Sequence, residues 1–88
     1  MTTFAREFNF NNDIMAVVAQ NIRKYRILKG ITQEQLAVDI GISHEYMRRV
    51  ESQNGSKGLT FENIYKISVV LGITLDDLIQ EEKEVVNN

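Results

Sequence analysis

The chain has 88 residues, enough for one small domain with a single hydrophobic core. It has no cysteine and only one histidine, which argues against a disulfide framework and a thiolate metal site, and no apolar run approaches the roughly 20 residues needed to cross a bilayer. We therefore expect a soluble, cytoplasmic protein that has no cofactor, binds no metal and does not contact the membrane, and the net charge of -2 argues against a generic polyanion binder.

No helix or strand is predicted in the first 12 residues. Three phenylalanines, Phe4, Phe8 and Phe10, stand among polar neighbours in this segment. The segment is either a mobile tail or an arm whose phenylalanines pack on the domain or on a second subunit, because three exposed aromatic side chains would lower solubility. We divide the chain into an N-terminal arm (1–12), one domain (13–80) and an acidic C-terminal tail (81–88).

Residues 13–29 are predicted to form an amphipathic helix. Gly30 suits the position just after its end, where a left-handed backbone conformation is common. Arg23 and Lys24 lie off the apolar stripe, so they are either solvated or in contact with phosphate. The apolar residues of this stripe recur at intervals of three and four positions: Ile14, Val17, Val18, Ile22, Tyr25 and Leu28.

Two short helices joined by a sharp turn are predicted between Gln33 and Ser52. Thr32 would begin the first helix, with Gln35 completing a capping box, and Ser43 would cap the second. Gly41 interrupts the apolar pattern where a chain reversal favours a residue that tolerates positive φ. The residues that we expect to hold the two helices together have helical spacing: Leu36, Ala37, Ile40, Met47 and Val50.

The second of these helices, residues 44–52, carries a polar face. Its side chains can donate, accept and stack, and a helix of this width fits the major groove of DNA. This face consists of His44, Glu45, Tyr46, Arg48 and Arg49.

Charge is unevenly distributed along the chain. Residues 20–57 contain seven basic and four acidic residues, which leaves a local charge of +3. Five acidic residues and one lysine follow between residues 76 and 84. Because salt screens charges over about 8 to 10 Å, the local excess matters more than the total for binding DNA.

After a polar loop that contains Lys57, two more helices are predicted. Thr60 would cap the fourth helix and Gly72 would end it, whereas Thr74 would cap a short fifth helix. The expected fold is therefore all-α and compact, with five helices and no strand. The fourth helix has Phe61, Ile64, Ile67, Ser68 and Leu71 on one face, and the fifth has Leu75, Leu78 and Ile79.

The segments IRKYRILKGITQEQLAVDIGISHEYMRRVE and LTFENIYKISVVLGITLDDLI resemble the Cro/C1-type (XRE) helix-turn-helix family of phage repressors and small bacterial regulators. The resemblance covers roughly residues 20–79 and implies a lambda-repressor-like domain with its helix-turn-helix at residues 33–52. It implies that Gln33 contacts phosphate and that Arg26 and Glu51 form an internal salt bridge. It also implies groove-facing positions for Ser43, His44, Glu45 and Arg49, with Tyr46 and Arg48 at their flanks. Tyr46 is similar to a tyrosine of the restriction-modification controllers, whereas His44 and Glu45 depart from their pattern.

We expect a dimeric repressor or autoregulator on a partly palindromic operator of double-stranded DNA. Phosphate contacts are expected from Gln33, Ser43 and Lys57. A homodimer interface is expected from the apolar residues Ile73, Leu75, Leu78 and Ile79.

Individual roles on the polar face stay open. For Arg49 we favour a contact with guanine, whereas Arg48 either contacts DNA or is solvated. Glu45 either accepts from cytosine or stabilises the start of its own helix, and His44 contacts a base or a phosphate. An antitoxin-like or adaptor module that binds another protein, with secondary DNA binding, is the alternative function. No arrangement of nucleophile, base and orienting group indicates an enzyme.

Overall fold

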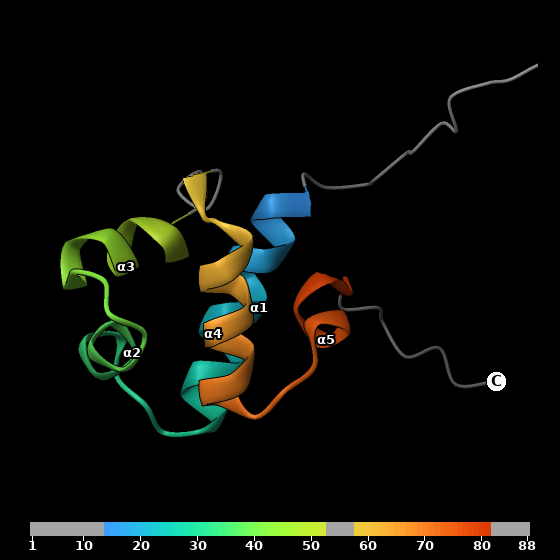
Figure 1. The fold of residues 1–88 in the computed structure, drawn as a ribbon. Coiled ribbons are helices and arrows are strands. Elements are labelled where there is room, and N and C mark those ends of the chain that lie inside the picture. Colours follow the sequence, from blue (N-terminus) through green and yellow to red (C-terminus); the bar gives the residue numbers. More distant parts are fainter. Residues whose placement is uncertain (1–13, 53–57, 82–88) are drawn as a thin grey trace, which may run out of the picture.

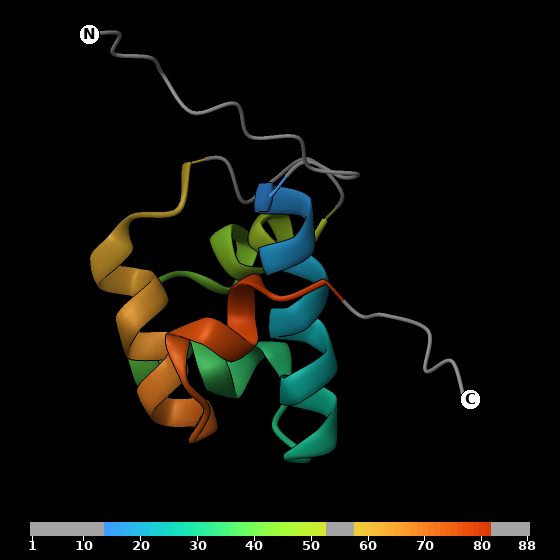
Figure 2. The ribbon, with the colours of Figure 1, turned by 90° about the vertical axis from the view of Figure 1, so that its right-hand side faces the viewer.

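The computed structural model describes residues 14–52 and 58–81, which form five α-helices and no strand. In the view of Figure 1, α4 lies in front of α1 in the middle of the molecule, α2 and α3 lie on one side of these two helices, and α5 lies on the other. Seen from the α5 side, α5 packs across α1 and α4 (Figure 2). The predicted all-α fold is confirmed. The bounds are α1 Ile14–Leu28, α2 Gln33–Ile40, α3 His44–Glu51, α4 Phe61–Leu71 and α5 Leu75–Ile79.

Threonine and serine begin four of these helices. The side-chain oxygens of Thr32, Ser43, Thr60 and Thr74 each accept a hydrogen bond from the backbone N–H three residues later, at 3.0 to 3.1 Å. Each bond satisfies a backbone donor that the first turn of the helix leaves unpaired. The four starts therefore lie where the sequence predicts them.

The capping box predicted for α2 is only half formed. The backbone N–H of Gln35 donates to Thr32, but the side-chain amide of Gln35 donates to Asp39 at 2.8 Å instead of returning to the backbone of Thr32. A complete capping box occurs at the start of α5, where Thr74 and Asp77 exchange two hydrogen bonds of 3.0 Å. The carboxylate of Asp77 can only accept, and it takes the backbone N–H of Thr74, whereas the amide of Gln35 can also donate and bonds Asp39 one turn further along its helix.

One hydrophobic core joins all five helices. Its largest fully buried side chains come from every helix, and burying each of them contributes roughly 1.5 to 3 kcal/mol. None of the helices in the described ranges is long and apolar enough to cross a membrane. The fully buried side chains are Val18, Ile22, Leu36, Met47, Val50, Ile67, Leu71 and Leu78.

Three apolar residues differ from their predicted environment. Leu28 and Phe61, both predicted on core-facing stripes, are about 70% exposed; Leu28 is the last residue of α1 and Phe61 is the first of α4. Leu78, predicted at a subunit interface, is fully buried within the chain. Its side chain belongs to the core between α5, α1 and α4, which corrects the prediction for that residue.

A buried asparagine attaches α5 to α1. The side-chain amide of Asn21 donates to the carbonyl oxygens of Leu78 at 2.8 Å and Gln80 at 2.9 Å. These carbonyls are at the end of α5, where backbone acceptors have no partner within the helix. Asn21 therefore satisfies the end of a five-residue helix that is too short to be stable by itself.

Candidate nucleic-acid interface

The turn between α2 and α3 fixes the relative orientation of the two helices. Gly41 has φ +81°, in the left-handed region, and its N–H and that of Ile42 both donate to the carbonyl of Ala37, at 2.9 and 3.0 Å. Ala37 is buried, and its small side chain allows the two helices to approach closely. Met47 and Val50 of α3 are fully buried against this surface. The inner face of α3 is thus anchored in the core.

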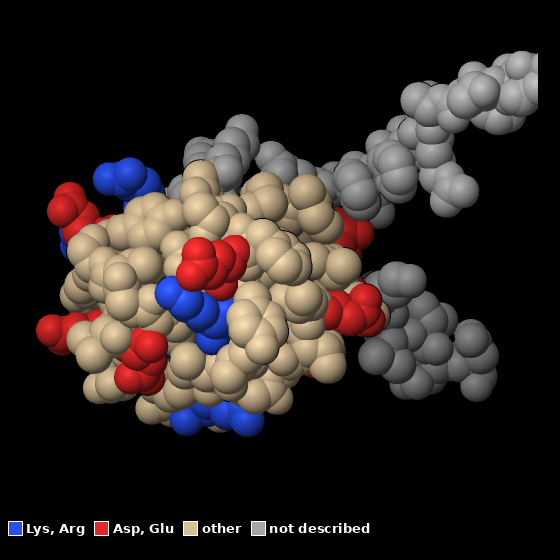
Figure 3. Space-filling model, viewed as in Figure 1, with Lys and Arg blue, Asp and Glu red and all other residues tan. Residues whose placement is uncertain are grey.

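The outer face of α3 is exposed and polar. In the described part of the chain, no hydrogen bond or ion pair engages the side chains of His44, Glu45, Arg48 or Arg49, all of which are exposed. Both basic and acidic side chains gather at the edge of the molecule formed by α3 (Figure 3). These four side chains are free to contact a ligand.

Tyr46 differs from its neighbours on α3. Its side chain is half-buried against the core, and its hydroxyl donates to the carbonyl of Gly58 at 3.2 Å. Tyr46 therefore connects α3 to the segment that leads into α4. The sequence does not reveal this contact, because twelve residues separate the two partners.

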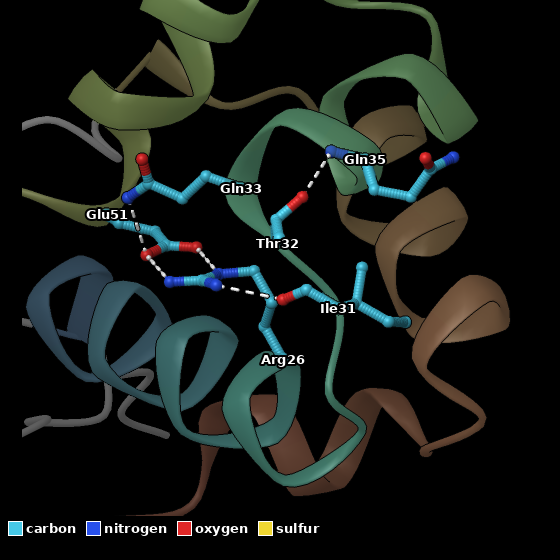
Figure 4. A network of polar contacts seen from close by, with 6 residues as sticks. All are labelled: Arg26, Ile31, Thr32, Gln33, Gln35 and Glu51. Atoms are coloured by element: carbon cyan, nitrogen blue, oxygen red, sulfur yellow. Dashed lines mark hydrogen bonds and ion pairs between the residues drawn. The ribbon is translucent and has the colours of Figure 1, made fainter.

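A polar network joins α1, α2 and α3 at the C-terminal end of α3 (Figure 4). Arg26 of α1 donates to Glu51 of α3 through Nε at 2.6 Å and Nη2 at 3.0 Å, so the predicted ion pair is present and bidentate. The Arg26 side chain is 12% exposed and that of Glu51 is 2% exposed. Arg26 also donates to the carbonyl of Ile31 at 2.9 Å, immediately before α2.

Gln33 belongs to the same network. Its Nε2 donates to Oε1 of Glu51 at 3.0 Å, so the first residue of α2 is bonded to the last residue of α3 (Figure 4). Gln35, two residues further along, points away from this network. The side-chain amide of Gln33 carries two protons, and its contact with Glu51 uses one of them.

The remaining predicted residues fall into two groups. Ser43 is exposed and caps α3 by accepting from the N–H of Tyr46 at 3.0 Å, whereas Lys57 lies outside the described residues. Near the C-terminus, Ile73 and Leu75 are half-buried and Ile79 is 48% exposed. These three residues, unlike Leu78, retain surface that a second subunit could cover.

The two helices joined by a glycine turn, with the second exposing a polar face, define a helix-turn-helix protein. Residues 22–78 match the family described as "Helix-turn-helix" (HTH_3). This range includes the helix-turn-helix and nearly all of the supporting core.

Two relatives are similar to this chain over most of its length. A hypothetical transcription factor of Neisseria meningitidis is 33% identical over 82 residues, which cover 93% of this chain and 76% of the relative. Its crystal structure has a TM-score of 0.70 to this chain, with 89% of this chain and 87% of that chain covered. The control protein C.MunI from Mycoplasma sp. is 36% identical over 75 residues, which are 83% of this chain and 99% of the relative.

SinR of Bacillus subtilis, the master regulator for biofilm formation, was crystallised in complex with DNA. Its structure is 27% identical to this chain with a TM-score of 0.64, and the match covers 72% of this chain and 98% of that one. The chain belongs to the Cro/C1-type helix-turn-helix family of transcription regulators.

Proposed function

We propose that this protein binds specific sites in double-stranded DNA as a two-fold dimer, with α3 in the major groove, and that it represses or autoregulates transcription from a partly palindromic operator. The observation that carries the proposal is the environment of α3. Met47 and Val50 pack the inner face of α3 into the core, and the Arg26–Glu51 ion pair holds its C-terminal end. The polar side chains on its outer face have no partner within the described ranges. A rigid helix with free polar side chains is what base reading requires.

The side chains on the outer face of α3 supply the base contacts. Arg49 is exposed on the outer face of the helix, away from buried Met47 and Val50, and a guanidinium can donate two hydrogen bonds to O6 and N7 of guanine. Glu45 precedes Arg49 by one helical turn and can accept from N4 of cytosine, whereas Arg48 and His44 flank this pair. Tyr46 contributes mainly by holding α3 against Gly58.

Phosphate contacts come from the beginnings of α2 and α3. The second amide proton of Gln33 can donate to a phosphate while the first remains on Glu51, so the network orients this donor. The hydroxyl of Ser43 accepts from its own helix and keeps its proton for a second phosphate oxygen. Lys57 would add a positive charge from the loop that follows α3. These contacts set the depth of α3 in the groove but carry no sequence information.

Dimerisation is assigned to the outer side of α5. Ile79 is about half exposed, and Ile73 and Leu75 keep part of their surface free. A two-fold contact through these residues would present two α3 helices to successive major grooves, about 34 Å apart on one face of the duplex.

The test is selection of bound duplexes from a random pool, followed by salt titration with the enriched sequence. We expect a palindrome whose half-sites are separated by about one helical turn. The logarithm of the binding constant should fall with the logarithm of salt concentration, with a slope of about 0.9 for each phosphate that a lysine or arginine neutralises. Failure to enrich any palindrome would contradict the proposed operator.

A further inference from the structure

An open apolar groove lies between α2 and α4, and its residues are not among those assigned to DNA. Its volume is about 490 Å³, and it begins at the C-terminal end of α2, away from Gln33. Val38, Tyr65 and Val69 line it, and each of them is more than half exposed. An apolar surface of this kind on a soluble domain is typical of a contact with another molecule.

The apolar surface extends beyond the groove along α4. Phe61, Tyr65 and Val69 recur every four residues, so they form a stripe beside the core-facing side of the helix. On the face of the molecule formed by α2 and α4, acidic and basic side chains stand among wider uncharged areas (Figure 3). Small-molecule sites bury most of their ligand among enclosed side chains. This shallow, exposed lining fits a second protein surface better.

The two walls of the groove carry opposite charges. Asp39 lies on the α2 wall, and Lys66 lies on the α4 wall. Asp39 accepts from Gln35 at 2.8 Å, and Lys66 is 3.5 Å from Glu62, but both contacts are exposed on single helices. Exposed contacts of this kind are weak, so each charge can exchange its partner at little cost.

We propose that this groove is a second self-association surface, which binds the same groove of another copy of the chain. A two-fold axis along the groove places α2 of one copy over α4 of the other. Asp39 of each copy then faces Lys66 of the other, and the contact occurs twice. Val38 packs in the same arrangement against Val69 of the second copy. Opposite charges on the two walls make the surface complementary to itself.

This surface is separate from α5. Helix α5 lies on the far side of the α1–α4 pair from α2 (Figures 1 and 2), so one chain has room for both contacts. Two DNA-bound dimers could therefore associate through their α2–α4 grooves. Only this last step rests on the proposed function, because self-association through the groove needs no DNA.

The test is sedimentation velocity of the full chain over a concentration series, in an Ile79→Glu background that removes the proposed α5 contact. We expect this variant to pass from the mass of one chain to twice that mass as its concentration rises. Adding Val69→Asp should abolish the larger species, and circular dichroism should show unchanged helix content, since Val69 is on the surface. A variant that stays monomeric without Val69→Asp, or dimerises equally with it, would overturn the proposal.

Charge reversal provides a second test that does not depend on one apolar substitution. In the same background, Asp39→Lys and Lys66→Asp should each weaken dimerisation, because like charges then face each other at both contacts. An equal mixture of the two variants should form heterodimers, because each contact again joins opposite charges. Glu34→Lys, a matched reversal on α2 outside the groove, should have no effect. Failure of the mixture to restore the dimer would show that the chains meet at another surface and would overturn the proposal.

Discussion

Gln33 and Glu51 are bonded to each other across the helix-turn-helix, from the first residue of α2 to the last residue of α3. The same carboxylate oxygen, Oε1 of Glu51, accepts from Nε2 of Gln33 and from Nη2 of Arg26, both at 3.0 Å. A single carboxylate therefore links the proposed phosphate contact at Gln33, the C-terminal end of α3 and α1. Stability and DNA binding should both depend on it, and substitutions can separate the two effects.

Replacing Glu51 with alanine should destabilise the fold. Arg26 would remain 12% exposed with its charge unpaired, and breaking a buried pair in this way costs about 3 kcal/mol. The measurement is urea unfolding followed by circular dichroism. Glu62→Ala is the matched control, because Glu62 pairs with Lys66 on the exposed surface of α4 and its loss should cost less than about 1 kcal/mol. Equal losses for the two variants would show that the Arg26–Glu51 pair does not stabilise the core.

Replacing Gln33 with alanine should weaken DNA binding equally for all sequences. A neutral donor to phosphate carries no sequence information, and its loss costs about 1 kcal/mol, or roughly fivefold in affinity. The salt dependence should be unchanged, because no positive charge is removed. Fluorescence anisotropy with the selected duplex and a scrambled one provides both values. A change confined to the selected duplex would mean that Gln33 contacts a base.

Much of the fold can be predicted from local sequence signals. Thr32, Ser43, Thr60 and Thr74 mark helix starts, Gly41 marks the turn, and apolar spacing locates most of the core. Leu78 is different, because a short helix with apolar residues on several sides does not reveal which of them the rest of the chain covers. Its complete burial depends on the packing of α5 against α1 and α4.

Asn21→Leu should destabilise the docking of α5. The substitution leaves the carbonyls of Leu78 and Gln80 without the donor that they share, and leaving a buried carbonyl unpaired costs about 1 to 3 kcal/mol. Amide hydrogen exchange should become faster in α5 than in α2, and urea unfolding should show a loss of about 2 kcal/mol or more. Gln80→Ala is the control, since the exposed side chain of Gln80 bonds only Asp76 among the residues that the structure describes. Unchanged exchange in α5 would contradict a role for Asn21 in its docking.

Tyr46→Phe should lower affinity without altering base preference. The substitution removes the hydroxyl that donates to Gly58 but keeps the ring packed against the core, so the expected loss of stability is about 0.5 to 1 kcal/mol. Repeating the duplex selection with this variant distinguishes the two roles of the residue. Relaxed preference at one base pair would mean that the hydroxyl reads a base.

The site shows where sequence patterns stop being informative. The polar face of α3 follows from helical spacing, and the Arg26–Glu51 pair follows from the family resemblance. The bonds from Gln33 to Glu51 and from Tyr46 to Gly58 join residues 18 and 12 positions apart, so they depend on how the helices pack. Asn21 had a visible signal, a polar residue next to Ile22 within an apolar stripe, which is typical of a buried side chain with a specific partner.

Arg49→Ala should relax the sequence preference of the protein at one base pair in each half-site. The side chain is exposed on the outer face of α3 and has no partner within residues 14–52 and 58–81. Losing a bidentate contact with guanine costs about 1 to 3 kcal/mol for the selected operator and nothing comparable for an operator changed at that base pair. Competition binding with single-base variants of the operator measures this difference. Arg48→Ala, which removes the same charge from the adjacent position, should lower the affinity for all these duplexes to a similar extent if Arg48 contacts only the backbone. An Arg49→Ala variant that keeps the full preference at every base pair would assign base reading to other side chains of α3.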